Sequence, residues 1–258
     1  PEEISAEGFQ LSRVGGPFFK SMGLGEFIAD PVPINIAEAV TFILRRPDWS
    51  FHQHAEAGQI ENIIRGLQLA VSTVDPCRIG TLSDRHSSLE HLNDATKKNL
   101  VDIASLGIGA GIQAVRFLFP DWQYSGPPYK AALETPGLNY AFGADGMFAG
   151  HGNPWITLQF MGTGESFNGE DILTEDPLGR GPQQVTLMDG LKGFTRNAAW
   201  FTREENERGQ IKVGYLADIV ILKRNPFEIN VRQIRDTKAA LTIVDGEVVY
   251  SDESIFFQ

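Results

Sequence analysis

The chain has 258 residues, 42% of them hydrophobic, which is enough to bury the core of one α/β barrel or of two smaller domains. Its formal net charge of -11 opposes electrostatic binding to nucleic acid or to an anionic membrane surface, so a small-molecule partner is expected. The single cysteine, Cys77, excludes an internal disulfide and a multi-cysteine zinc site, and it fits a reducing, cytoplasmic compartment.

The sequence also lacks the apolar run of about 18 residues or more that a membrane-spanning helix needs. No basic and apolar leader is visible at Pro1, so neither a signal peptide nor a membrane span is predicted. Any bound metal must be held by histidines and carboxylates, because one cysteine cannot supply a thiolate cluster.

The first elements are predicted from weak patterns. Residues 13–20 suggest a strand, and residues 21–26 suggest a loop after it. Asn35 is predicted to cap a helix, with arginines at its C-terminal end. The inner face of this helix would carry Ile36, Val40, Ile43 and Leu44.

Stronger periodicity follows a short strand that contains His52 and His54. A helix over residues 58–71 is predicted from apolar residues that recur every three or four positions, at Ile60, Ile63, Ile64, Leu67 and Val71. A second amphipathic helix would begin at Asn93 or Asp94, stop at Gly107 and bury Leu100, Ile103, Ala104 and Leu106. Strands and helices therefore alternate, which is typical of a parallel α/β sheet or barrel.

The second half of the chain continues with a strand over residues 108–113 and another that ends near Asp145. Long loops over residues 121–137 and 146–181 are predicted to shape a pocket. Thr186 is predicted to start a helix that buries Leu187, Leu191, Phe194 and Ala198. The last predicted elements are a buried strand at 217–222 and two short strands about an Asp-Gly turn within 241–250. We predict a barrel portion over residues 1–205 and a small β domain over residues 206–258.

Three polar residues share one kind of position. His54, His91 and Asp145 each end a short apolar or small-residue segment and are followed by turn residues. A polar residue at the C-terminal end of a strand in an alternating pattern is the mark of a barrel active site.

Several segments resemble one known family. The chain resembles the C-terminal part of the amidohydrolase superfamily, in the family 3 branch that includes N-substituted formamide deformylase-like enzymes. Residues 209–222, 225–226 and 242–246 resemble the closing β-sandwich strands. Residues 54–55, 89–91 and 143–145 resemble the fifth, sixth and eighth barrel strands.

The resemblance implies a TIM-barrel-like metal-dependent hydrolase with a composite β-sandwich domain. His54 and His91 would be metal ligands, and Asp145 would be both a ligand and the catalytic base for the water that the metal activates. One or two divalent ions, zinc above all, would be bound. Lys20, or Glu26 in its place, is a candidate bridge between two ions; the alternative is an exposed residue in a loop.

Four other polar residues are considered, and the sequence leaves two interpretations open for His52 and for His151. His52 is either a partner of the metal ligands or a packed histidine, and Gln113 is a candidate hydrogen-bond donor in the pocket. His151 either contacts substrate or lies at the surface. His86 is expected in a solvated turn.

One departure limits the resemblance. The family opens its barrel with an H-x-H pair on the first strand, whereas all five histidines here lie at or after the proposed fifth strand. We therefore expect the last half of such an enzyme, completed by an N-terminal portion or by another chain, with homo-oligomerisation left open. The expected reaction is hydrolysis of a non-peptide, amide-type C–N bond. The alternatives are a catalytically incomplete binding scaffold, and an ester or phosphoester hydrolase on the same fold.

Overall fold

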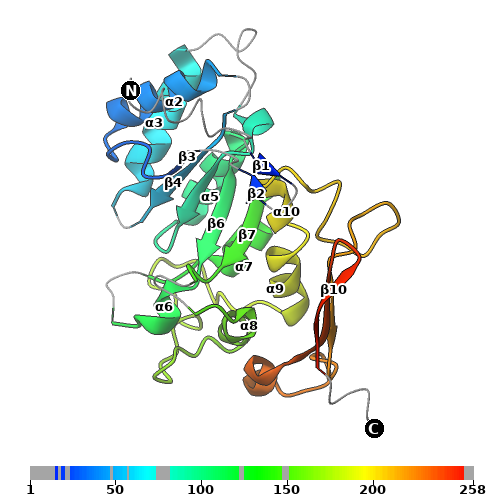
Figure 1. Ribbon diagram of the computed structural model, residues 1–258. Helices are drawn as coiled ribbons and strands as arrows, with labels where there is room; N and C mark the ends of the chain where they lie inside the picture. The colour runs from blue at the N-terminus through cyan, green and yellow to red at the C-terminus, as the bar shows by residue number, and fades with distance from the viewer. Residues whose placement is uncertain are drawn as a thin grey trace.

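The computed structural model describes residues 15–16, 19–20, 24–46, 49–56, 58–73, 82–121, 125–146 and 151–252. Its centre is a five-stranded parallel sheet in the order β3-β4-β5-β6-β7 (Figure 1). These strands are β3 (Leu24–Glu26), β4 (Phe51–Ala55), β5 (Ser88–His91), β6 (Gly109–Gln113) and β7 (Asn139–Gly143). The predicted alternating, parallel architecture is confirmed, and it is that of a partial TIM-barrel-like fold.

Helices connect the parallel strands and cover one face of the sheet. α2 (Pro33–Leu44) precedes β4, α3 (Ile60–Thr73) precedes β5, α5 (Lys97–Ser105) precedes β6, and α7 (Tyr129–Glu134) precedes β7. Each of these helices contacts the next one along the chain. Two shorter helical turns complete the connections: η1 (Ser83–Arg85) precedes β5, and α6 (Val115–Leu118) follows β6.

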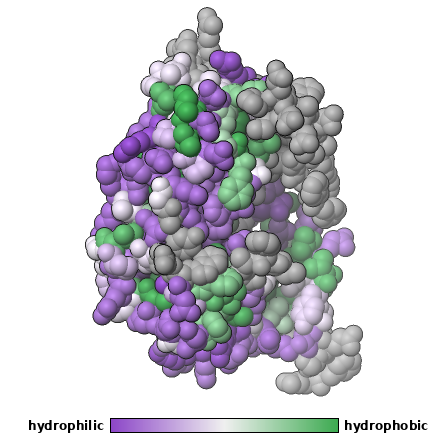
Figure 2. Space-filling model, turned by 90° about the vertical axis from the view of Figure 1, so that its left-hand side faces the viewer, coloured by the Kyte–Doolittle hydropathy of each residue, from purple (hydrophilic) through white to green (hydrophobic). Residues whose placement is uncertain are grey.

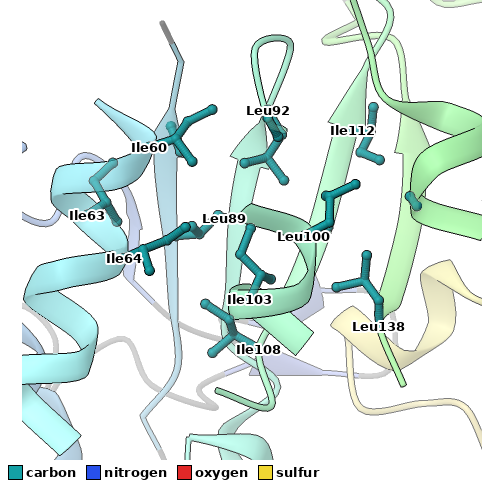
Figure 3. Close-up of a cluster of buried hydrophobic side chains, with 14 of the residues drawn as sticks. Ile60, Ile63, Ile64, Leu89, Leu92, Leu100, Ile103, Ile108, Ile112 and Leu138 are labelled. Atoms are coloured by element: carbon teal, nitrogen blue, oxygen red, sulfur yellow. The ribbon is translucent and has the colours of Figure 1, made fainter. Parts of the chain in front are cut away.

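The main hydrophobic core lies between these helices and the sheet (Figure 3). Ile64 of α3 and Ile103 of α5 lie beside Leu89 of β5, and Ile63 of α3 belongs to the same cluster. All four side chains are buried. The predicted inner faces of α2, α3 and α5 are confirmed at most positions; Val71 is the exception, with 41% of its surface exposed.

Replacing Leu100 with alanine is expected to lower the free energy of unfolding by about 2–5 kcal/mol, because Leu100 is fully buried and its loss leaves a cavity. Val101, the next residue of α5, is 53% exposed, so Val101→Ala is the matched control and should change stability by about 0.5 kcal/mol or less. Urea unfolding of both variants measures the difference. Equal effects at the two positions would contradict the packing described for α5.

Both predicted long loops are partly helical. α7 lies inside residues 121–137, and α8 (Pro154–Thr163) lies inside residues 146–181. Prolines obscured both helices in the sequence, although Pro154 stands at the first turn, where a missing N–H is tolerated. The loops predicted to shape a pocket are therefore shorter than the sequence suggested.

Two helix starts and two strand assignments also differ from prediction. α2 begins at Pro33 rather than after Asn35, and α5 begins at Lys97 with Thr96 as its cap. Residues 13–20 contain two two-residue strands, β1 (Gly15–Gly16) and β2 (Phe19–Lys20), in an antiparallel pair. Glu26 ends strand β3 instead of lying in a loop, which places its backbone at the edge of the sheet.

After α8, two further helices pack near β7, the last strand of the parallel sheet. α9 (Leu187–Phe194) is capped by Thr186 as predicted, and α10 (Ala198–Phe201) follows it. Gly193 lies so close to β7 that a Cβ atom there would stand 2.1 Å from the Phe142 ring. Only glycine permits this approach, so α9 seals the end of the core at β7.

The C-terminal residues form a separate three-stranded antiparallel sheet in the order β10-β9-β8 (Figure 1). Its strands are β8 (Ile219–Leu222), β9 (Ala239–Val244) and β10 (Glu247–Ser251), with the turn η2 (Val231–Asp236) before β9. The predicted Asp-Gly hairpin is confirmed: Asp245 and Gly246 have φ of 51° and 82°, as a type I′ turn requires.

One prediction for this sheet was wrong. Residues 217–222 were expected to be buried, but Val220 and Ile221 are 54% and 50% exposed. The apolar residues 219–222 have the pattern of a strand that is covered on both faces. Among the described residues, however, no second sheet packs against this strand. The β-sandwich therefore stays a prediction, as does the domain boundary at residue 206.

The surface shows no broad apolar belt on the face turned to the viewer in Figure 2, which is mainly hydrophilic with separate hydrophobic areas. Within the described part of the chain, no helix is long and apolar enough to cross a membrane.

Candidate metal centre

Three potential metal ligands meet at the C-terminal ends of adjacent strands. Glu26 ends β3, His54 lies near the end of β4, and His91 ends β5. One ligand atom from each lies within 4.8 Å of the other two, and among the described residues this is the group that meets such a criterion. Parallel strands bring these ends together at one edge, as predicted for a barrel site.

The carboxylate of Glu26 stands between the two imidazoles. Its Oε1 lies 2.8 Å from Nδ1 of His54 and 2.6 Å from Nε2 of His91. The two imidazole rings lie 4.2 Å apart between centroids. The three groups thus already share one centre.

The backbone explains how His91 reaches this centre. In a regular strand His91 would follow Leu89 to the helix-covered face, because side chains alternate. Its φ of 72°, followed by 59° at Leu92, is left-handed and breaks the alternation. Such a conformation is uncommon and costly for residues other than glycine, and strained backbone of this kind clusters at functional sites.

Glu26 is kept ionised by its partners. Partial burial by itself raises the pKa of this carboxyl, but hydrogen bonds and charges of His54 and His91 hold the pKa below its ordinary value. An ionised carboxylate with two imidazoles is a donor set that suits Zn²⁺, and catalytic zinc sites often have three such protein ligands. The residues present therefore fit a divalent ion.

A second carboxylate, which the sequence analysis did not single out, lies behind the histidines. Glu56 follows β4 and is buried, with 8% of its side chain exposed. Its Oε1 lies 3.6 Å from Nδ1 of His91, and its Oε2 lies 4.0 Å from Nε2 of His54. Buried Asn93 donates a hydrogen bond of 2.6 Å to Glu56 Oε1. The feature of the sequence that could have pointed to Glu56 is its position two residues after His54.

A buried ion pair fixes the loop that carries Asn93. Arg180 binds both carboxylate oxygens of Asp176, and the two side chains are 1% and 2% exposed. The guanidinium also donates to the carbonyl oxygens of Asn93, Ala95 and Gly126. Arg180 therefore connects the segment after α8 to the loop beside the site.

The stability of this pair should depend on pH. Burial by itself raises the pKa of Asp176. The hydrogen bonds and the charge of Arg180 lower this pKa by more than burial raises it, so the net pKa lies below the ordinary value of 3.8. The pair therefore contributes fully above pH 3.8, and its contribution is lost as the pH falls through the lowered pKa. Urea unfolding between pH 5 and about 2 should show a steeper loss for the wild type than for Asp176→Asn. Parallel curves would contradict the assignment.

Asp145 lies apart from the three-residue group. It follows β7, two strands beyond β5 in the sheet, and it is not among the mutually close ligand atoms of the described residues. Its backbone has a φ of 51°, and its N–H donates to Oε1 of Gln113 at 3.1 Å. Gln113 thus holds Asp145 through its main chain. Asp145 as a ligand and base, and Gln113 as a substrate contact, stay predictions.

His52 belongs to a polar cluster deeper on the inner face of the sheet. Its Nδ1 lies 2.6 Å from Ser88 Oγ and 3.3 Å from Glu90 Oε1, and Ser88 donates to Glu90. A Cβ at Gly111 would stand 1.8 Å from the Glu90 carboxylate. His52 is therefore partnered by Ser88 and Glu90, and it does not join the group of Glu26, His54 and His91.

The remaining candidates lie elsewhere. His151 packs edge-on against Phe117 at 5.5 Å between centroids, and burial lowers its pKa. His86 follows the turn η1, as predicted, but its side chain is packed: Nε2 lies 3.2 Å from Glu205 Oε1, and the ring contacts Trp200. The side chain of Lys20 lies outside what the structure describes, so its bridging role stays a prediction.

The parallel strands and the donor set define a partial barrel of the metal-dependent hydrolase type. Comparison of the sequence with protein-family models agrees, since the amidohydrolase family model matches residues 19–250. The chain belongs to the amidohydrolase family. A 66-residue stretch is 32% identical to YtcJ of Bacillus subtilis (strain 168), which is named as an amidohydrolase; it covers 26% of this chain and 12% of that protein.

Solved structures show the same fold. The atrazine chlorohydrolase TrzN of Arthrobacter aurescens TC1, in complex with zinc and atraton, aligns with a TM-score of 0.65 at 17% identity, over 98% of this chain and 56% of that one. An amidohydrolase of Thermotoga maritima MSB8 aligns with a TM-score of 0.57 at 16% identity, over 83% and 46%. The chain spans about half the length of these solved structures, and the stretch that matches YtcJ spans 12% of that protein.

Proposed function

We propose that this chain takes part in metal-dependent hydrolysis of a non-peptide, amide-type C–N bond in a small molecule. The observation that carries the proposal is the convergence of Glu26, His54 and His91 at the ends of three adjacent parallel strands. Membership of the amidohydrolase family supports the reaction class.

In this proposal Glu26, His54 and His91 would hold the ion. Asp145 would accept a proton from the attacking water and return it to the leaving amine. Gln113 keeps the main chain of Asp145 in place. A bound divalent ion supplies Lewis acidity and lowers the pKa of water towards about 7. The zinc in the TrzN structure supports zinc as the ion. The single cysteine supports a reducing, cytoplasmic setting.

We also propose that further strands complete the barrel beside β3. Among the residues that the structure describes, β3 is an edge strand and pairs with β4 alone. Phe27, Val32 and Ile34, which follow it, are 70%, 47% and 52% exposed. An exposed strand edge with apolar neighbours is usually covered by another element. The length of the solved relatives supports a completing polypeptide, either an N-terminal portion or another chain, a second copy included.

The experiment is elemental analysis and native mass spectrometry of the purified protein, followed by a substrate panel. One or two equivalents of zinc are expected. The species completed by a further polypeptide should release amine from N-formyl or N-acyl amines, and chelation should abolish this activity. A species heavier than the 28.4 kDa chain would support completion by a further polypeptide. The isolated chain alone should turn over poorly.

The same panel contains the alternatives. Cleavage of lactones or phosphotriesters without amine release would replace the proposed bond with an ester or phosphoester. A lone 28.4 kDa species that binds no zinc would reduce the chain to a binding scaffold of the same fold. Robust amide hydrolysis by the isolated chain would contradict the proposed need for completion.

A further inference from the structure

We propose that Glu56 is a positioning residue that orients both histidines of the metal centre from behind. The inference rests on the proposed function, since it concerns the same centre. It begins with the two nitrogens of each imidazole. Nδ1 of His54 and Nε2 of His91 face Glu26. The opposite nitrogens, Nε2 of His54 and Nδ1 of His91, face the two oxygens of Glu56.

This arrangement divides each ring into a metal side and an outer side. A neutral imidazole that binds a metal through one nitrogen carries its proton on the other. That outer N–H is held by a carboxylate, carbonyl or water in nearly all metal sites. Here a single carboxylate faces both outer nitrogens, 3.6 Å from Nδ1 of His91 and 4.0 Å from Nε2 of His54. In this proposal one side chain therefore sets the tautomer and the angle of two ligands.

The burial of the groups supports the assignment. Nδ1 of His91 is buried and has no hydrogen-bond partner at present. Its distance of 3.6 Å from Glu56 Oε1 is a few tenths of an ångström too long for a hydrogen bond. A small rotation of the ring gives this nitrogen a partner, which a buried donor needs.

Glu56 is itself held in place. Asn93 donates to Oε1 at 2.6 Å, and Arg180 donates to the carbonyl oxygen of Asn93. A hydrogen bond from Asn93, which Arg180 holds in turn, therefore fixes the position of the Glu56 carboxylate. A ligand-orienting group works only when its own position is set by packing and hydrogen bonds.

Charge gives a further argument. The ion pairs of Glu26 and Glu56 within the described part of the chain are all with His54 and His91. Two acidic side chains and two imidazoles, with no Lys or Arg paired to either acid in the described part of the chain, form a donor set that favours a divalent cation. Glu56 thus contributes charge to the centre without touching the ion.

The test compares Glu56→Gln with Glu61→Gln in the full chain. Both changes remove one carboxylate, and Glu61 lies on α3 outside the centre, with 47% of its side chain exposed. Zn²⁺ affinity is measured by competition with a chromophoric chelator. The imidazole N–H protons of the zinc-loaded proteins are followed by NMR, because a purely structural role would not move them. Glu56→Gln should weaken Zn²⁺ binding by about 10–100-fold, and the N–H signals of both histidines should shift.

Glu56→Asp keeps the charge on a shorter side chain and is expected to recover part of the affinity; it serves as the test should Glu56→Gln fail to fold. Wild-type zinc affinity and unchanged N–H signals in Glu56→Gln, or in Glu56→Asp where only that variant folds, would overturn the inference and leave the proposed metal centre standing. Failure of the wild type to bind zinc would overturn the proposed metal centre, and the inference with it.

Discussion

Replacing His91 with asparagine is expected to lower the affinity of the chain for Zn²⁺ by about 100-fold or more. The change removes one of three ligands, whereas loss of an outer partner alone costs about 10–100-fold. His91 is 6% exposed and its Nε2 lies 2.6 Å from Glu26, so water cannot replace the imidazole without rearrangement. Competition with a chromophoric chelator at neutral pH measures the affinity.

His86→Asn is the matched control. It makes the same chemical change at a histidine outside the centre, where the backbone has a φ of 52° that asparagine tolerates. His86 contacts Glu205 and Trp200, so the control tests whether loss of any packed histidine weakens zinc binding. If both variants lose affinity equally, the assignment of His91 as a ligand is wrong.

Replacing Arg180 with methionine is expected to destabilise the fold by about 3–5 kcal/mol. The substitution leaves the buried carboxylate of Asp176 without its partner. It also removes the donors to the carbonyl oxygens of Asn93, Ala95 and Gly126. Unpaired buried charge, rather than loss of the ion pair itself, dominates the cost. Urea unfolding at neutral pH measures it.

Lys98→Met provides the comparison, because it breaks an exposed ion pair with the same spacing of four residues. Lys98 contacts Asp102, but 73% of its side chain is exposed. Solvent screening makes the contribution of such an exposed pair to stability far smaller than that of a buried pair. An Arg180→Met variant as stable as Lys98→Met would show that the segment after α8 is not fastened to the loop of Asn93 in the way described.

The sequence predicted the parts of the fold that depend on local patterns. The spacing of Ile60, Ile63, Ile64 and Leu67 gave α3 and its buried face, and the Asp245-Gly246 pair gave the β9–β10 hairpin. His54 and His91 were identified from their positions at strand ends, and the structure brings them together. Their role as ligands is the part that experiment must test.

The sequence could not predict features that depend on distant contacts. β3 has only three residues, one of them glycine, so the strand that carries Glu26 has no periodic signal. Arg180 reaches Asn93 across 87 positions of sequence, and no local pattern encodes that contact. The exposure of Val220 and Ile221 has the same origin, because an apolar strand looks identical whether or not another sheet covers it.

The short strand β3 has a consequence for how the protein responds to metal. It is the sheet's edge, and Glu26 at its end is joined to β4 and β5 through the two histidines. An ion held by these three side chains would fasten the outermost strand to the two behind it. Any ligand that binds only the folded state adds stability, about 2.7 kcal/mol at a concentration 100 times its Kd. Bound zinc would therefore stabilise the pairing of β3 with the rest of the sheet. Chelation would destabilise β3 before it affects the helix-covered core.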